Sequence, residues 1–230
     1  MRTSDVRRER ELRRRQEYRE VVIHAAERVI LRKSYSAMTM DDVAREAHLS
    51  KATVYKYVAG KGALLAEIMG HQIESVRALA AGIVAGPGSA AERLGGLVRV
   101  VLQNSEDTRH FNRILAMDKA MLRLMRVFHH PAGRTGGVSP ADRKIPAMLR
   151  QKRREIVDLG ARVLREGIAA GEFRSMDTDR ASAFIEAVLQ GYTHMRFWEG
   201  DAPLSPTAAA DLTRFIIEGI RAPQRPGKEI

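Results

Sequence analysis

The chain has 230 residues, no cysteine and a net formal charge of +11, from 39 lysine and arginine residues against 28 aspartate and glutamate residues. This length suits one large domain or two modest ones. The lack of cysteine excludes a disulfide framework and thiolate metal ligands. No apolar run approaches the roughly 18 residues of a membrane span, and the charged N-terminus is unlike a signal peptide, so we expect a cytoplasmic protein. The basic surplus favours a polyanionic partner such as nucleic acid without identifying one.

The first 15 residues contain seven arginines, and beyond Met1 their only sizeable apolar side chains are Val6 and Leu12. Because such a segment cannot bury an apolar face, we predict a flexible basic arm over residues 1–15. Two roles stay open. The segment is either a solvated tail or helical extension held by ion pairs, or an arm that orders on the phosphates or in the minor groove of DNA. A helix follows over about 17–33, where apolar residues recur at three- and four-residue steps.

Two short helices follow, and residues 16–65 are predicted to form a helix-turn-helix domain. Thr39 and Asp42 have the spacing of a capping box, so a helix begins at Met40. Ser50 can cap a second short helix from Lys51. Two short helices separated by a three-residue turn have the dimensions of a helix-turn-helix.

The residue types in this unit suit DNA. Ala44 is small enough for the point where the two helices cross. The first residue of the turn often needs a positive φ, and His48 stands there, a tolerated but unusual choice. The exposed face of the second helix carries hydroxyls, aromatic edges and lysines, which suit phosphate and base-edge contacts in a major groove. No acidic residue occurs between Glu46 and Glu67, whereas a merely solvated helix face would include some.

Residues 17–65 resemble the DNA-binding domain of the TetR/AcrR family of bacterial transcriptional regulators. Four stretches at the family's spacing carry the resemblance: Ala25-Ala26, Thr39 to Ala44, Leu49 to Tyr57, and Lys61 with Leu64-Leu65. The sequence departs from the family pattern where it has Ser34 and His48 in place of usual glycines, Val58 in place of phenylalanine, and Gly62 in place of an acidic residue.

The resemblance implies a set of DNA-binding residues in and beside the second short helix: Thr39, Lys51, Ala52, Thr53, Tyr55, Lys56, Tyr57 and Lys61. Tyr55 and Lys61 match positions that mostly contact phosphates. Lys51, Ala52 and Lys56 are better placed for base edges, and the short Ala52 side chain could approach a thymine methyl.

The fold class that we predict is all-α, with about nine helices. Helix start and stop signals recur through the rest of the chain, and strand-like runs are missing. The N-terminal helix-turn-helix three-helix domain is followed by a larger helical ligand-binding and dimerisation domain over residues 66–221. Residues 222–230 are predicted to be a tail.

The last two predicted helices carry apolar stripes that suit a homodimer. A single small recognition helix binds weakly, so proteins of this kind usually dimerise and read a palindrome. By resemblance, the two helices form a four-helix interface between copies, although the stripes could instead close the core of one chain. The stripes consist of Phe184, Ile185, Val188, Leu189 and Tyr192, and of Leu212, Phe215, Ile216 and Gly219.

A methionine stripe marks the middle of the chain, with Met117, Met121 and Met125 at four-residue steps. Such a stripe is typical of core packing and also of an adaptable apolar pocket. The family's ligand cavity lies among the middle helices, so the resemblance implies a set of candidate ligand-binding residues: His110, Phe111, Met117, Met121 and Trp198. Basic residues nearby suit a solvated face or the anionic head of an apolar effector, such as a carboxylate or an acyl thioester.

The sequence therefore predicts a ligand-responsive, sequence-specific DNA-binding regulator. By the habit of the family it is a repressor, released from a palindromic operator by a small apolar effector. The alternative is a nonspecific architectural DNA-binding protein. We expect no enzyme, no metal site and no cofactor, because HExxH, nucleophile-elbow and P-loop motifs are missing. The adjacent His129 and His130 would point about 100° apart on a helix and chelate poorly.

Overall fold

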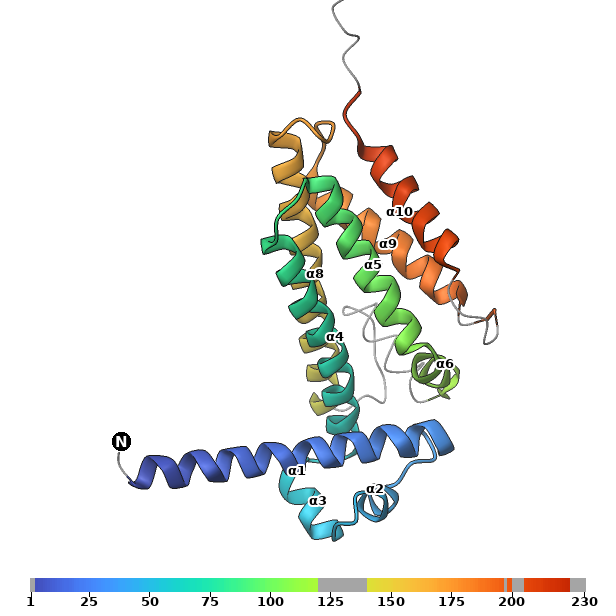
Figure 1. Cartoon of the computed structure of the whole chain (residues 1–230). Coiled ribbons are helices and arrows are strands. Elements are labelled where there is room, and N and C mark those ends of the chain that lie inside the picture. Colours follow the sequence, from blue (N-terminus) through green and yellow to red (C-terminus); the bar gives the residue numbers. More distant parts are fainter. Residues whose placement is uncertain (1–2, 120–139, 197, 200–204, 224–230) are drawn as a thin grey trace, which may run out of the picture. The chain divides into compact units, whose positions relative to one another are not determined.

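The computed structural model describes residues 3–119, 140–196, 198–199 and 205–223, and within these ranges the chain is built of helices joined by turns (Figure 1). The all-α fold is confirmed for this part of the chain. The helices are α1 (Thr3–Lys33), α2 (Met40–Glu46), α3 (Lys51–Tyr57), α4 (Lys61–Ala85), α5 (Ala90–Asp107), α6 (Arg109–Met117), α8 (Pro140–Ala169), α9 (Thr178–Arg196) and α10 (Pro206–Ile220).

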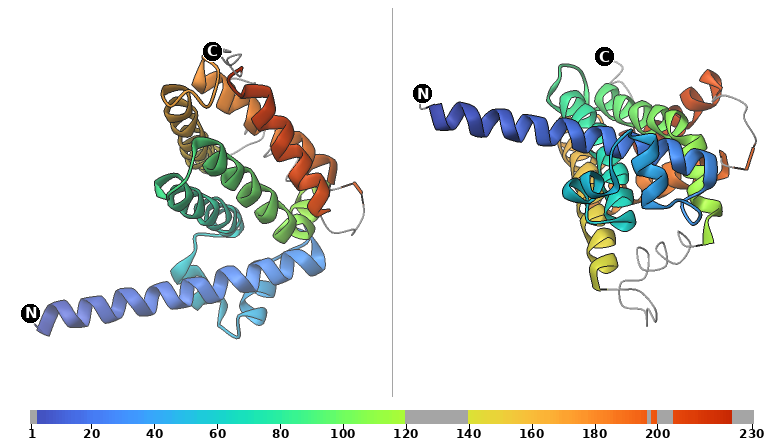
Figure 2. Two further views of the ribbon diagram at one scale, coloured as in Figure 1. Left: turned by 45° about the horizontal axis from the view of Figure 1, so that its top comes forward. Right: turned by 90° about the horizontal axis from the view of Figure 1, so that it is seen from below.

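Helix α1 includes most of the predicted basic arm, in agreement with the open alternative of a helical extension. It begins at Thr3 and runs without a break to Lys33, so that residues 3–15 lie in its first half (Figure 2). Arginine, glutamate and leucine are good helix formers. Glu9 with Arg13, and Glu11 with Arg15, also have the i, i+4 spacing at which opposite charges support a helix.

The chain divides into two compact units, one of Met1–His71 with His110–Arg150 and one of Gln72–Arg109 with Gln151–Ile230. Helices α4 and α8 contribute residues to both units. The predicted boundaries at residues 15, 65 and 221 stay predictions.

The core of the first unit is formed by the inner faces of α1 to α4, with two residues of α6. Val22, Val29, Val54 and Leu64 are fully buried in it, and Phe111 of α6 packs against the same cluster. The predicted periodicity of α1 is thus confirmed. The helix buries one apolar stripe over its second half and leaves its first half outside the core.

The second unit has two neighbouring clusters. One joins α4, α5 and α8 around Leu94, Val163, Leu164 and Phe173. The other joins α5, α9 and α10 around Val98, Leu102, Leu189 and Ile216. In the part of the chain that the structure describes, no helix has both the length and the apolar composition needed to cross a membrane.

Local capping explains where these helices start. Thr39 makes the predicted capping box with Asp42, and Ser89 makes a second one with Glu92. Ser50 accepts a hydrogen bond from the Thr53 amide as the N-cap of α3. The start of α5 has a further cap from outside the helix. The Glu172 carboxylate accepts hydrogen bonds from its first two backbone amides, at 2.9 and 3.0 Å. These contacts satisfy N–H groups that have no partner within a helix.

Candidate nucleic-acid interface

The turn before α2 is held by a polar network around Asp42. Its carboxylate accepts hydrogen bonds from the Thr39 amide at 3.1 Å and from the Thr39 hydroxyl at 2.8 Å, while the hydroxyl oxygen accepts one from the Asp42 amide. The Lys33 ammonium lies 2.8 Å away. Together with the Thr39 hydroxyl, it holds the pKa of Asp42 well below its usual range. Thr39, predicted to contact DNA, is exposed, and its hydroxyl already serves as this cap.

Two residues near α2 take the left-handed backbone region. His48 has φ 54°, as predicted for the first residue of the turn, and Ser34 has φ 75°. The sequence marked Ser34 only as a place where glycine is usual. Glycine reaches positive φ without a steric penalty, whereas other residues pay about 1–2 kcal/mol there. Both departures from the family pattern therefore fall where the backbone still needs the conformation that glycine favours.

Helix α3 presents the expected face. Val54 is fully buried against α1 and α2, which turns Ala52, Tyr55 and Lys56 outward, where they are exposed. Thr53, whose hydroxyl is 2.8 Å from that of Ser50, is half-buried. The helix thus offers a short polar surface with a methyl, a phenol and an ammonium available to a groove of DNA.

Two of the predicted DNA-binding residues also have partners within the protein. The Lys51 ammonium is 2.9 Å from the Asp41 carboxylate, and both side chains are exposed to solvent. This pairing raises the pKa of Lys51. The half-buried ring of Tyr57 stacks on Tyr18 of α1, with ring centroids 5.3 Å apart and planes within 4°. Tyr57 therefore links α3 to α1 in addition to facing the surface.

Lys61, at the start of α4, is held by the turn after α1. Its ammonium donates to the Ser36 carbonyl at 2.9 Å and lies 4.6 Å from the centre of the Tyr35 ring. Burial lowers its pKa. Asp118, buried just after α6, accepts hydrogen bonds from the Ser36 amide at 2.6 Å and hydroxyl at 2.5 Å. The segment after α6 is thus tied to the turn that positions Lys61, a contact that the sequence did not indicate.

Ion pairs fix α1 against the rest of the first unit. Arg28 and Arg32 both reach the Glu46 carboxylate of α2 at 2.6 Å, which lowers the pKa of Glu46. Arg19 pairs with Glu67 of α4 through two hydrogen bonds of 2.7 and 2.8 Å. These ion pairs therefore hold α1 against both α2 and α4.

An open groove of about 800 Å³ lies where α1 passes α3. The sequence shows how many arginines the first 15 residues hold, but a flexible arm has no helical face on which they could be grouped. In a continuous helix from Thr3, the register places several of these arginines on the side that faces the groove. The groove is lined by Arg7, Arg10, Glu11, Arg14, Arg15 and Tyr18 of α1, by Leu49, and by Thr53, Lys56 and Tyr57 of α3.

The candidate ligand-binding residues have different surroundings. In the first unit, Phe111 is 7 % exposed within the core, whereas Met117 is 63 % exposed and His110 is exposed. In the second unit, Trp198 is 61 % exposed, its ring 6.2 Å from that of His194. Met121 lies outside the described residues. The role of these residues in ligand binding stays a prediction.

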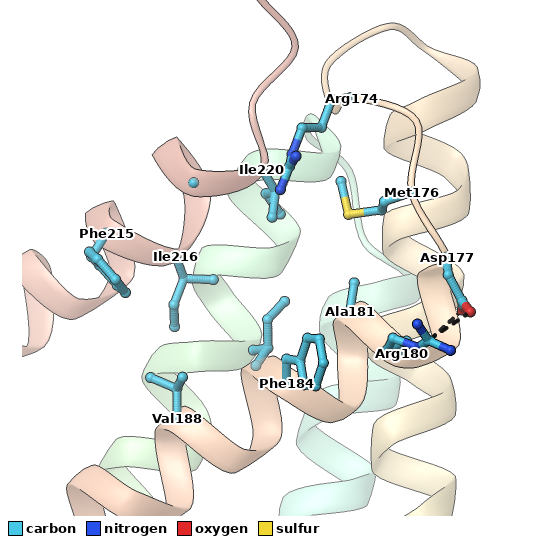
Figure 3. Close-up of a pocket in the computed structure, with 12 residues that line it drawn as sticks. Arg174, Met176, Asp177, Arg180, Ala181, Phe184, Val188, Phe215, Ile216 and Ile220 are labelled. Atoms are coloured by element: carbon cyan, nitrogen blue, oxygen red, sulfur yellow. Dashed lines mark hydrogen bonds and ion pairs between the residues drawn. The ribbon is translucent and has the colours of Figure 1, made fainter.

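The predicted dimerisation stripes are divided between the core and the surface. Leu189 and Ile216 are buried in the second unit. Phe184 and Phe215 point outward, 65 % and 70 % exposed. Together with Val188 they line an apolar groove of about 440 Å³, formed by residues of α9, of α10 and of the segment just before α9 (Figure 3). The stripes therefore have a buried and an exposed edge, and the interface between two copies stays a prediction. One edge closes the core of this chain, and the other edge is an apolar surface.

Among the described residues, no three histidine, aspartate or glutamate side chains are grouped so that they could hold a metal ion.

Comparison with known proteins agrees with this geometry. Residues 22–68 match the model of the bacterial regulatory proteins of the tetR family. Among solved structures, a tetR-family regulatory protein from Rhodococcus RHA1 is 21 % identical, with a TM-score of 0.66 over 90 % of this chain and 98 % of that one. A TetR/AcrR-family regulator from Thermobifida fusca is 25 % identical, with a TM-score of 0.62 over 89 % and 99 %.

The fatty acid degradation regulator FadR from Bacillus halodurans is 17 % identical, with a TM-score of 0.67 over 90 % of this chain and 97 % of that one. A search of curated proteins gave no match. The helix-turn-helix and the match over residues 22–68 define a DNA-binding domain of the type found in bacterial regulatory proteins of the tetR family. The chain as a whole is similar in fold to solved regulators of that family.

Proposed function

We propose that this regulator is a ligand-responsive repressor that binds a palindromic operator as a homodimer and is released by a small apolar effector. The observation that carries the proposal is the outer face of α3. Val54 anchors the helix in the core and leaves Ala52, Tyr55 and Lys56 exposed beside one another. In this proposal the protein acts in the cytoplasm.

In this proposal α3 enters the major groove. Lys56 and Ala52 face base edges, where a lysine can donate to guanine and a methyl group can pack on a thymine methyl. Tyr55 and Lys61 contact phosphates, which fix the register of the protein on the duplex. Thr39, Lys51, Thr53 and Tyr57 flank this face and complete the proposed contact set. Lys51 would exchange its exposed pairing with Asp41, a weak contact in water, for one with DNA.

The homodimer would form through α9 and α10. The exposed rings of Phe184 and Phe215 lie beside small residues of the same two helices, where close approach of a second copy is possible. Burying an exposed phenylalanine is worth about 1.5–3 kcal/mol. A two-fold axis between these helices would present two α3 helices to half-sites about 34–36 Å apart.

Release by an effector would come from a shift between conformations. A ligand that binds better to a conformation with differently spaced α3 helices lowers the population that fits the operator. FadR of Bacillus halodurans, a structural neighbour, is described as a fatty acid degradation regulator. This supports a lipophilic effector with an anionic head for the present chain, with His110, Phe111, Met117, Met121 and Trp198 as candidate contacts.

A selection from random DNA followed by titration tests the DNA-binding proposal. We expect the selected duplex to bind at least roughly 10³-fold more tightly than scrambled DNA. Lys56→Ala should weaken binding to the selected duplex by about 5- to 150-fold, the worth of a good base contact of about 1–3 kcal/mol. Arg154→Ala, which removes an exposed cation of α8, is the matched control and should bind as the native protein does.

Equal affinity for selected and scrambled duplexes would instead support the nonspecific architectural protein. Equal effects of Lys56→Ala and Arg154→Ala would refute the role of α3. For the effector, a thermal-shift screen should show that fatty acids or acyl thioesters raise the melting temperature. Stabilisation by neutral lipophiles alone would overturn the anionic head.

A further inference from the structure

We propose that the first half of α1 is a second DNA-binding surface, which holds the phosphate backbone beside the major groove that α3 enters. This inference rests on the proposed function, since it takes α3 as the recognition helix. It assigns a role to the arginines that the helix-turn-helix does not use.

The arginines are arranged by helical register. Arg7, Arg10 and Arg14 follow at three- and four-residue steps, and Tyr18 continues the same line. At 3.6 residues per turn these positions share one face of a helix. All four line the groove that α1 forms with α3, and Lys56 lines it from the other side. One surface therefore carries both the recognition helix and the arginine row.

Charge is sorted between the faces of the helix. On the groove side, Arg7, Arg10, Arg14 and Arg15 stand against Glu11, a net charge of +3, and Lys56 of α3 makes it +4. Outside the groove lining, from residue 7 to residue 18, Arg8 and Arg13 are balanced by Glu9 and Glu17. A helix stabilised only by ion pairs would need no such asymmetry. A surface that tracks the phosphates of a duplex does.

The row is fixed relative to α3. Tyr18 stacks on Tyr57 of α3, and the Arg14 guanidinium lies 5.6 Å from the centre of the Tyr18 ring. From Tyr18 to Arg7 the helix rises about 16 Å, at 1.5 Å per residue. The surface thus extends a fixed distance from the recognition helix. A pre-organised surface loses less conformational entropy on binding than a loose arm does.

The occupant is duplex DNA because the groove is shared. Thr53, Lys56 and Tyr57 of α3 form one wall of it. Phosphates border the major groove, so a duplex that binds α3 there would bring flanking phosphates toward the α1 wall as well. The contacts involve charge and carry no base sequence, so they should strengthen binding to selected and scrambled DNA alike.

Two double variants of the full-length protein test this. Arg7→Gln with Arg10→Gln removes two charges from the groove. Arg8→Gln with Arg13→Gln removes two charges from the same helix outside the groove lining. Affinity for the selected and the scrambled duplex is measured across a range of salt concentrations. Each phosphate contact contributes about 0.9 to the slope of log K against log salt.

For the groove pair we expect the slope to fall by about 1.8 per protomer, or about 3.6 for a dimer on one operator. The control pair should keep the native slope. The ratio of affinities for selected and scrambled DNA should be unchanged in the groove pair. By contrast, Lys56→Ala should lower that ratio. Circular dichroism of both pairs should show native helix content.

Equal slopes in the groove pair and the native protein would overturn the proposal, as would equal losses in the two pairs. Polyglutamate serves as the probe for a different occupant. If the groove pair keeps its slope on DNA but loses affinity for polyglutamate, the surface takes an acidic polypeptide and the proposal fails. A native protein without preference for any selected duplex would contradict the proposed function, whatever the arginine variants do.

Discussion

Gly167 of α8 is a position where one methyl group should be costly. A Cβ built there would lie 2.5 Å from a ring carbon of Phe173 and 2.8 Å from the Ala90 methyl, closer than real Cβ contacts. Phe173 is 3 % exposed within the core of the second unit, and Ala90 is the first residue of α5. Neither neighbour is the free end of a flexible side chain, so the backbone must move to admit Gly167→Ala.

The expected cost follows from two opposing terms. Overpacking a tight core costs about 1–3 kcal/mol, and replacing glycine by alanine inside a helix recovers at most about 1 kcal/mol. Because the contacts at Gly167 are shorter than 3.0 Å, the upper part of that range applies, about 2–3 kcal/mol, and the net destabilisation is about 1–2 kcal/mol. In a chain of this size, each kcal/mol shifts the melting temperature by about 2–4 °C. We therefore expect a fall of about 2–8 °C.

Thermal unfolding followed by circular dichroism, at one fixed protein concentration, measures this shift. The matched control is Gly82→Ala in α4. A Cβ at this exposed site would meet no other part of the protein within 4 Å. The higher helix propensity of alanine is then the remaining effect, and it should raise the melting temperature. The reasoning is refuted if both variants shift the melting temperature in the same direction.

Three further predictions follow from the described geometry. Ser34→Gly should raise the melting temperature by about 1–4 °C, because relief of the positive φ gains about 1–2 kcal/mol and the greater freedom of glycine in the unfolded chain offsets about 0.5–1 kcal/mol of it. Ser34→Ala should not raise it. For Asp42 the folded pKa is lowered by Lys33 and Thr39, so its contribution to stability is present above the unfolded pKa of about 4 and is lost as pH falls. Asp42→Asn should therefore lower the urea midpoint of unfolding at pH 6. The midpoint of the variant should also fall less than that of the native protein when the pH is lowered through about 4, and an equal fall in both proteins would contradict this. Phe184→Asp with Phe215→Asp should give a folded monomer in analytical ultracentrifugation, and an unchanged mass would rule out α9 and α10 as the interface.

The helix-turn-helix could be predicted from sequence because its determinants are local. The capping residues Thr39 and Ser50 each act within three residues of their partner. His48 marks the turn, and Val54 marks the buried side of α3. Each of these signals is a property of a few consecutive residues. The family resemblance then indicated how the short helices are arranged as one DNA-binding domain.

What sequence could not supply depends on neighbours distant in the chain. The arginines before Tyr18 were counted as an arm because nothing local showed which of them face α3. The contact between Asp118 and Ser36 spans 82 residues and has no periodic signature. The helical spacing of Met117 identifies a face but not what covers it, and its side chain is exposed.

The stripes of α9 and α10 show the same limit. Periodicity identified both helices as amphipathic but did not separate Leu189, which closes the core, from Phe184, which faces outward. In the sequence, an apolar stripe that is broad enough for both a core and an exposed surface looks like a single apolar face. Packing against α5 decides which of its residues are buried and which remain exposed.

The central claim is that two α3 helices of one dimer read the two halves of a palindrome. The most direct measurement compares the selected duplex with the same duplex carrying five additional base pairs between its half-sites. That insertion turns the half-sites to opposite sides of the helix, since they must lie about 34–36 Å apart or multiples of one turn. We predict that affinity falls to near that of scrambled DNA, with one dimer bound to the intact site. Equal affinity for both duplexes would contradict the account.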